Sequence, residues 1–435
     1  MKFYSAFVAM LLTCSVAFGQ AGFKGFLDRF VSGYKSLNLP QLELSYVDQL
    51  NHIGPVAAVQ NQFKFFSAVR LVLKKFDPGK LTVSQKNDYQ LIKYETDINL
   101  TRIALEFEWI AKRPAQVPAN GIYNIPDGKG WYKYLIKRWA DDDITPEAVY
   151  QFGLNEVKLA NQQIEAIRKE TGLSEEAFYK YLNDTSFYIT NPAQIQQAFE
   201  QTRKLVMQNL PKLFSNTKIP QLEIRKGNSD RLAQTPGYYD DNVFYYNSFN
   251  NHVNKRQVDW LFLHEAVPGH YYQSVVLAQA KVSEVQKLFY YMGFAEGWGA
   301  YAEEYGGELG LYKTPYNRLG EWEWGIVRSI RLPIDVGINY YGWTNEQALN
   351  FWKKYIKGQD DIALREIQRV RRWPAQVITY KHGAAKLMEW KAQLIKKQGS
   401  RFDIKEFHSR ILSHGSLPFF IIRKNVFNNY VFSNY

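Results

Sequence analysis

Cysteine is nearly absent, since Cys14 is the only one in 435 residues. It lies within residues 1–19, which predict an export signal because charged Lys2 and a short apolar run precede small residues up to Gly19. Cleavage after Gly19 removes Cys14, so we expect a mature chain without disulfides and without a thiolate as metal ligand or nucleophile. We expect an exported protein, periplasmic or secreted. A lipoprotein anchored through Cys14 is less favoured, because Thr13 is a poor residue before a lipidated cysteine.

Long apolar runs, internal repeats and low-complexity segments are also lacking. The apolar stretch near the N-terminus is too short to span a membrane, so we expect no membrane span. No repeat of about 20 to 50 residues is visible, which argues against a solenoid. The net charge of +12 suits an acidic surface or an acidic substrate. The basic residues are scattered and match no recognised binding motif, so we expect no nucleic-acid partner.

Helical patterns prevail in what is present. Apolar residues make up 46% of the chain and aromatic residues 16%, which is enough for a sizeable core in one large domain or two closely packed ones. Helical spacing of apolar residues runs across residues 91–110, and prolines and glycines interrupt it between residues 114 and 130. We therefore expect a mostly α fold, with an N-terminal helical region over residues 20–120 and a larger domain over residues 121–435.

Two short β-prone runs, residues 219–225 and 242–247, are bounded by turn formers. We expect them to pair in a small β-sheet just before the segment described next. The run 242–247 is a candidate edge strand that holds a peptide backbone by strand addition. An ordinary core strand is the alternative.

Histidine is scarce as well, yet two of the seven flank one glutamate in the segment His264-Glu265-Ala266-Val267-Pro268-Gly269-His270. The segment is similar to the zinc-peptidase helix motif H-E-x-x-H with two residues inserted. Six residues of regular helix would turn His270 about 120° away from His264. Pro268 cannot donate the helical hydrogen bond and Gly269 tolerates unusual backbone angles, so we expect this pair to bulge out and His270 to return to the face of His264. Two imidazoles and a carboxylate can hold a metal ion and activate water on it. Core histidines without a metal are the alternative.

A catalytic zinc ion takes a third protein ligand and keeps a fourth position open. Glu296 follows His270 by 26 residues, a distance that suits a turn and a returning helix. Glu303 lies seven residues further on, two turns along the same side. We predict Glu296 as the third ligand and Glu303 as the partner that orients a histidine N–H. Solvated carboxylates on a helix face are the alternative.

With these residues the chain resembles a family of bacterial proteins named domain of unknown function 885. Its members share His-Glu-x-x-Pro-Gly-His and then Glu-Gly-Trp-x-x-Tyr-x-Glu, which stand here at residues 264–270 and 296–303. Two further family blocks are matched in part, over residues 369–383 and 402–418. The likeness covers roughly residues 120 to 425, and the ordered set of motifs is specific.

The chain resembles the gluzincin metallopeptidases more loosely, among them thimet oligopeptidase and carboxypeptidase Taq. This resemblance implies a large helical metallopeptidase-like fold with a deep channel and a small β-sheet next to the zinc-binding helix. It makes residues 121–435 a catalytic metallopeptidase-like domain. Val370 and Ala375 stand where the family usually has Tyr and Gly, which leaves the channel shape and the substrate length open.

The resemblance and the residue types imply one Zn²⁺ ion, held by His264, His270 and Glu296. Zinc lowers the pKa of its bound water toward about 7. Glu265 would take the proton and deliver it to the leaving amine. A His/His/Glu set also takes manganese or cobalt, so the ion in the cell stays open.

The tetrahedral oxyanion needs hydrogen-bond donors placed in advance. The family blocks favour Tyr380 for this role, with His408 and His382 behind it. Lys381 or Arg372 could hold a substrate carboxylate, as a carboxypeptidase or a peptidyl-dipeptidase needs. Solvated charges are the alternative for both.

We therefore expect an exported zinc peptidase that hydrolyses short peptides. A zinc hydrolase of another amide or ester is the first alternative, because the same site polarises any carbonyl. A catalytically silent peptide-binding protein of the same fold and a helical scaffold with core histidines are the others. The presence of Glu265 argues against a silent binder, which needs no general base. The pattern leaves side-chain preference, the end of the peptide attacked and the oligomeric state open.

Overall fold

The computed structural model describes residues 20–215, 218–233, 235–249 and 251–428. The predicted export signal, residues 1–19, lies outside the described residues. The chain divides into two units. Of the described residues, unit 1 takes in residues 20–41, Gly54–Phe107 and Ser283–Leu288, and unit 2 takes in Leu42–Ile53, Glu108–Val282 and residues 289–428.

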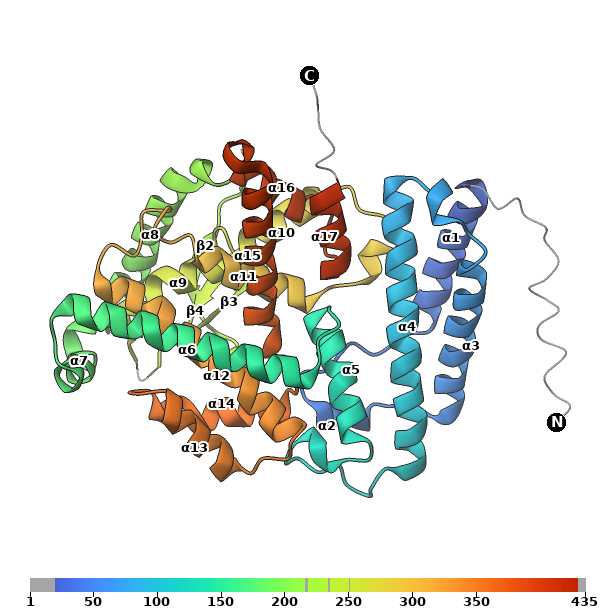
Figure 1. The fold of residues 1–435 in the computed structure, drawn as a ribbon, viewed down its shortest axis with the longest axis horizontal. Coiled ribbons are helices and arrows are strands. Elements are labelled where there is room, and N and C mark those ends of the chain that lie inside the picture. The colour runs from blue at the N-terminus through green and yellow to red at the C-terminus, as the bar shows by residue number, and fades with distance from the viewer. Residues whose placement is uncertain (1–19, 216–217, 234, 250, 429–435) are drawn as a thin grey trace, which may run out of the picture. The chain divides into compact units, whose positions relative to one another are not determined.

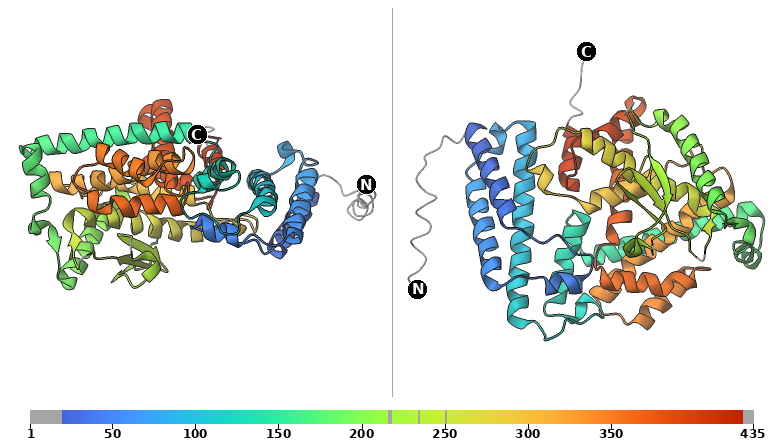
Figure 2. Two further views of the ribbon diagram at one scale, coloured as in Figure 1. Left: turned by 90° about the horizontal axis from the view of Figure 1, so that it is seen from below. Right: turned by 180° about the vertical axis from the view of Figure 1, so that it is seen from behind.

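Unit 1 is built from three long helices that lie side by side (Figures 1 and 2). They are α1 (Gln20–Ser36), α3 (Val56–Leu73) and α4 (Val83–Lys112), of which α4 runs on into unit 2. Phe23, Phe26 and Phe76 meet in its core with ring centroids 5.0 to 5.9 Å apart. The helical spacing predicted over residues 91–110 is therefore confirmed within α4.

Unit 2 holds the remaining helices. They are α2 (Tyr46–Asn51), α5 (Gly128–Ala140), α6 (Pro146–Thr171), α7 (Glu175–Tyr181), α8 (Pro192–Asn209), α9 (Lys255–Glu265), α10 (His270–Gln279), α11 (Met292–Glu303), α12 (Pro315–Asn339), α13 (Asn345–Tyr355), α14 (Asp360–Arg372), α15 (Ile378–Gln398), α16 (Ile404–Leu412) and α17 (Phe419–Asn428). Local sequence explains several starts: Thr145 and Asn191 cap α6 and α8, and each helix has proline in its first turn.

Helix α12 is the centre of unit 2, since its residues from Gly325 to Asn339 are all buried. It packs along α6, where Gly153 permits a close approach: a Cβ at position 153 would lie 2.5 Å from Cδ of Pro333. The apolar core between α6, α12, α13 and α14 includes Val157, Ile330 and Trp352. A helix this enclosed can fix polar side chains in place, because their surroundings do not relax.

The sheet of unit 2 has the order β2-β4-β3 and lies on one side of the helices (Figure 2). Its strands are β2 (Glu223–Lys226), β3 (Gly237–Asp240) and β4 (Val243–Tyr246). Strand β4 pairs parallel with β2 and antiparallel with β3. The short strands β1 (Tyr188–Ile189) and β5 (Val253–Asn254) form a separate antiparallel pair.

The sheet packs against α9, as the ring contact between Phe244 and Phe262 at 6.0 Å shows. The prediction of a mostly α fold with a small sheet next to the His264 helix is thus confirmed. The predicted pairing of the runs 219–225 and 242–247 is confirmed as well. No helix among the described residues combines the length and apolar character that crossing a membrane requires.

The run 242–247 is not an edge strand, and that prediction is wrong. Strand β4 is the central strand and β3 forms the edge. Asp241 and Asn242 both have positive φ and join β3 to β4 as a two-residue hairpin, the turn that such residues favour. Strand β3 is only four residues long, and its end residues Gly237 and Asp240 are disfavoured in strands, so its signal in the sequence is weak.

Candidate metal centre

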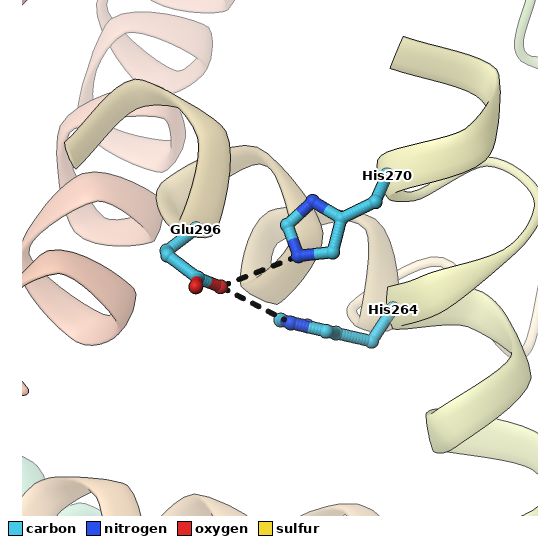
Figure 3. A group of neighbouring side chains, drawn as sticks. All are labelled: His264, His270 and Glu296. Carbon is cyan, nitrogen blue, oxygen red and sulfur yellow. Dashed lines mark ion pairs between the residues drawn. The ribbon is translucent and has the colours of Figure 1, made fainter. Parts of the chain in front are cut away.

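A break between α9 and α10 brings His264 and His270 together. Helix α9 ends at Glu265, and α10 begins at His270 with Gly269 as its N-cap. The two imidazole rings lie 4.7 Å apart between centroids, with their planes at 82° (Figure 3). The inserted residues thus form a link between two helices, a larger departure than the expected bulge within one helix.

The link follows a tightly packed path. A Cβ at position 269 would lie 1.8 Å from the carbonyl oxygen of His264, so only glycine fits there. The indole N–H of Trp298 donates to the carbonyl oxygen of Pro268 at 2.8 Å. The helix that carries Glu296 therefore also holds the link between the histidines.

Glu296 projects from α11 toward both histidines (Figure 3). Its Oε2 lies 3.4 Å from Nε2 of His264 and 3.3 Å from Nε2 of His270. Ligand atoms bound to one zinc ion at about 2.0–2.1 Å and at tetrahedral angles lie about 3.3–3.4 Å apart. One ligand atom from each of the three residues lies within 4.8 Å of the others. The donor set, and the distance of Glu296 from each histidine, therefore fit a single tetrahedral metal ion.

The far side of the His264 ring is held by Glu303 and Arg328. Glu303 Oε1 lies 2.6 Å from Nδ1 of His264, and both Glu303 oxygens accept from Nη1 of Arg328, at 2.6 and 2.7 Å. A carboxylate at Nδ1 fixes the tautomer that leaves Nε2 unprotonated for a metal. Gly299 makes room for the His264 ring, because a Cβ at position 299 would lie 2.7 Å from Cε1 of His264.

Electrostatics favour a cation at the centre of this cluster. Burial and Arg328 oppose a charge on His264, but the hydrogen bonds that its ring donates to Glu296 and Glu303 outweigh both and raise its pKa to about 9. Burial alone would raise the pKa of Glu296, and the two histidines outweigh it and lower that pKa well below its ordinary value. Without a metal, the site therefore takes up a proton as its positive charge.

A cavity of about 360 Å³ opens beside this cluster, and Glu265 lines it together with His264, His270 and Glu296. Burial raises the pKa of Glu265, and the charges of the two histidines lower it in part. A carboxylate with an elevated pKa, next to the position of a metal ligand, suits a general base.

Tyr380 lines the same cavity, and its hydroxyl donates to Glu296 Oε1 at 3.1 Å. Its ring stacks on the His264 ring, with centroids 6.1 Å apart and planes at 26°. Burial raises its pKa, and the charge of Glu296 adds to that effect. The phenol therefore keeps its proton at neutral pH and can donate it in a hydrogen bond.

Sequence reasoning gave no role to the arginines of the cavity wall, although Arg369 opens one of the matched family blocks. Arg328 and Arg331 project from α12, and Arg369 projects from α14. A signal was available in the sequence, because Arg328 and Arg331 interrupt the apolar run from Ile326 to Ile334, and an arginine in a buried helix is rarely there without a partner.

The structure does not bring His408 to the cavity. Both ring nitrogens are taken, Nε2 by the Tyr301 hydroxyl and Nδ1 by the Leu213 carbonyl, each at 2.9 Å. The ring stacks on Phe214, and burial lowers its pKa to about 3. We therefore do not place His408 among the candidate catalytic residues, because it is a neutral histidine of the core.

The other residues considered from sequence also lie elsewhere. His382 lies 3.1 Å from Asp142, and Lys381 forms an ion pair with Glu156 at 3.3 Å. Arg372 is exposed and lies over the ring of Trp373. His382, Lys381 and Arg372 are not among the residues that line the cavity.

The edge strand β3 also lines the cavity, through Gly237, Tyr238 and Tyr239. An edge strand presents unpaired backbone groups to which an extended peptide can add. The role that the sequence suggested for residues 242–247 thus has a better candidate in the neighbouring strand.

Comparison with solved structures finds proteins of the same fold, among them two that are described as lipoproteins. One is a "putative lipoprotein" from Colwellia psychrerythraea, with 23% identity and a TM-score of 0.66, over 86% of this chain and 69% of that one. The other is a "putative lipoprotein of unknown function" from Shewanella oneidensis, with 21% identity and a TM-score of 0.59, over 86% of this chain and 72% of that one. The comparison with curated proteins found no match.

A family model matches residues 102–426, which include every residue of the His264, His270 and Glu296 cluster and its cavity wall from Leu232 onward. Its description is "Bacterial protein of unknown function (DUF885)". The match extends over well more than half of the chain, so this protein belongs to the DUF885 family.

Proposed function

We propose that this protein is a metal-dependent hydrolase of peptide bonds, with zinc as its ion. One observation supports this most strongly: Nε2 of His264, Nε2 of His270 and Oε2 of Glu296 converge at the spacing of a tetrahedral site, beside a cavity with a free carboxylate. No hydrogen bond to the Glu265 carboxylate is found among the described residues, so this group is available for a proton.

A zinc ion in such a site polarises a carbonyl and lowers the pKa of water. Glu265 would accept the proton of the attacking water and then donate it to the leaving amine. The Tyr380 hydroxyl, now directed at Glu296, would turn to the oxygen that gains negative charge. Arg369 and Gln376 hold that hydroxyl in place as donors at 3.1 and 3.4 Å.

Peptides are the proposed substrates because the cavity combines three features. Its volume of about 360 Å³ accommodates a few residues rather than a folded protein. The edge strand β3 offers backbone groups, and Trp260, Trp324 and Trp373 offer apolar surface. A hydrolase of another amide or of an ester would share the ion and the base but would not need the strand.

A peptide-library digest read by mass spectrometry tests this proposal. Zinc-loaded protein is incubated with the library, and chelator-treated protein serves as the control. We expect cleavage that the chelator abolishes and added zinc restores. A set of esters and lactones is tested in parallel. If these are cleaved while the peptides stay intact, the substrate is an ester or lactone and not a peptide. If the protein takes up no metal at all, the proposal is wrong.

We also propose that the protein is exported. The sequence pattern of residues 1–19 supports this, and the two structures of the same fold are described as lipoproteins. Fractionation of cells that express the full chain, beside a Cys14→Ser variant, tests it. Export with an unchanged distribution of the variant indicates cleavage of the signal, loss of membrane association in the variant indicates lipidation, and retention of both in the cytoplasm contradicts export.

A further inference from the structure

Arg369 differs from the other two arginines of the cavity in its partners. Arg328 donates to both oxygens of Glu303, and Arg331 donates to Glu366 at 2.7 Å. Arg369 donates to neutral acceptors, the Gln376 amide oxygen and the Tyr380 hydroxyl, each at 3.1 Å. No carboxylate of the described residues forms an ion pair with it, and its buried Nε has no hydrogen-bond partner there.

The charges around the cavity leave one positive charge uncompensated. With a divalent ion bound, the site and its direct partners hold five positive charges, from that ion and the three arginines. They hold four negative charges, from Glu265, Glu296, Glu303 and Glu366. A buried charge without a counterion is costly. A ligand with one negative charge would therefore neutralise the remaining positive charge of this cavity.

The position of Arg369 indicates where on a substrate the negative charge must lie. Its Nη2 is separated from Glu296 by two hydrogen bonds of 3.1 Å, one to Tyr380 and one from Tyr380. One extended residue spans about 3.3–3.6 Å. A substrate group bound to Arg369 therefore lies within about two residues of the part of the substrate that is bound beside Glu296.

We propose that Arg369 binds a carboxylate of the substrate, located within about two residues of the bond that is cleaved. Arginine pairs with a carboxylate through its fixed charge and its N–H groups. Arg369 lines the cavity, and its N–H groups other than the two on Nη2, which Gln376 and Tyr380 accept, have no protein acceptor among the described residues. The carboxylate is the C-terminal group of the peptide or an acidic side chain near the cleaved bond. This inference rests on the proposed function, and it assigns the role to Arg369 instead of Arg372 or Lys381.

The competing explanation is that Arg369 only positions the Tyr380 hydroxyl. The two roles make different predictions for matched substrates. A positioning residue affects a free acid and its amide equally, whereas a carboxylate-binding residue affects only the acid.

Three peptides test the proposal. Two share one sequence without internal acids and are the free acid and the C-terminal amide; the third is that amide with glutamate placed next to the cleaved bond. We expect zinc-loaded protein to prefer one carboxylate peptide over the plain amide by roughly 10- to 100-fold in kcat/KM, the usual range for a hydrogen-bonded charge pair. The free acid identifies the C-terminal source, and the glutamate amide identifies the side-chain source. Arg369→Met should reduce the preference to near 1, Arg369→Lys should keep part of it, and the exposed Arg372→Met on the same helix should keep all of it.

The preference is a ratio within each variant, so partial unfolding does not imitate the effect. The same peptides with a fluorescent label are titrated into zinc-loaded Glu265→Gln protein, with and without Arg369→Met. If no peptide is cut, the proposed function fails while this binding ratio still decides the role of Arg369. Equal binding of acid and amide, or a preference that survives Arg369→Met, overturns the inference.

Discussion

At the scale of single residues, the site is a set of charges that compensate one another. His264 contacts Glu296 through one nitrogen and Glu303 through the other, and Arg328 balances Glu303. Each group is buried or half-buried, so removing one leaves a partner with an uncompensated charge. Residue changes here therefore need replacements that keep the shape.

Glu265→Gln keeps the shape of the side chain and removes its ability to accept a proton. Glu265 is not one of the three residues whose ligand atoms cluster, so zinc binding should persist. We expect activity to fall by about 10²- to 10⁴-fold, the usual contribution of a general base. Metal content by atomic spectroscopy and kcat on a cleaved peptide give the two values. Loss of zinc together with activity would show that Glu265 is needed for the ion itself.

Glu303→Gln should weaken the site without removing a ligand. The amide oxygen can still accept from Nδ1 of His264, but it no longer neutralises Arg328. Changes in such outer partners reduce metal affinity by about 10- to 100-fold. A competitive chelator titration measures this, with the exposed Glu308→Gln as control, because Glu308 lines neither this site nor the cavity beside it. Equal affinities in both variants would contradict the orienting role of Glu303.

At the scale of elements, glycines decide how closely helices approach around the site. Gly297 of α11 meets Gly383 of α15, where a Cβ at 297 would lie 2.5 Å from the Cα of 383. Gly299, half a turn further, faces the ring of His264. Helix α11 can thus carry Glu296 and Glu303 on either side of one histidine because glycines stand where it comes closest to α15 and to the His264 ring.

Gly299→Ala should therefore disturb the metal site more than the fold. The new Cβ would lie 2.7 Å from the His264 ring, which must move away from Glu296 or Glu303. We expect weaker zinc binding and a smaller rise in melting temperature on zinc addition, since a ligand stabilises by its affinity for the folded state. Gly307→Ala is the control, because a Cβ there meets nothing within 4 Å. An unchanged zinc-induced rise in Gly299→Ala would show that α11 can shift at no cost.

At the scale of the whole molecule, stability depends on groups far from the site. In unit 1, Asp88 of α4 accepts a hydrogen bond from Ser283, which lies 195 residues further along the chain. Burial raises the pKa of Asp88 to about 6, although the Ser283 hydroxyl lowers it in part. This contact ties the short segment Ser283–Leu288 to the helices of unit 1.

The raised pKa of Asp88 predicts a pH-dependent effect of Asp88→Asn. Folded protein holds a proton on Asp88 up to about pH 6, while the unfolded chain loses it near its ordinary value of 3.8. The cost of the buried charge therefore grows from about pH 4 and is complete above pH 6, on the order of 3 kcal/mol. We expect Asp88→Asn to raise the melting temperature relative to the parent by about 2 °C more at pH 8 than at pH 4.5.

Melting curves at both pH values test this, with the exposed Asp28→Asn as a control of the same chemistry. An advantage of Asp88→Asn that is equal at the two pH values, or larger at pH 4.5, would contradict the sign of the shift.

Much of this molecule follows from local sequence. Helical spacing, the caps at Thr145 and Asn191, and the β-prone runs predict the elements because propensity and capping act over a few residues. The candidate ligands could also be predicted from the sequence. His264, Glu265 and His270 stand in one segment, and Glu296 lies on a later helix that packs back against it.

Only the tertiary structure decided what surrounds those ligands. The contacts of Arg328 and Arg369 join α12 and α14 to α9 and α15, and the order of the sheet placed β3 at the cavity and not β4. His408 does not reach the cavity, because packing places both of its ring nitrogens in hydrogen bonds within the core. A short segment can determine which atoms could bind a metal, but which charges compensate them depends on residues dozens to more than a hundred positions away, and only packing brings those together.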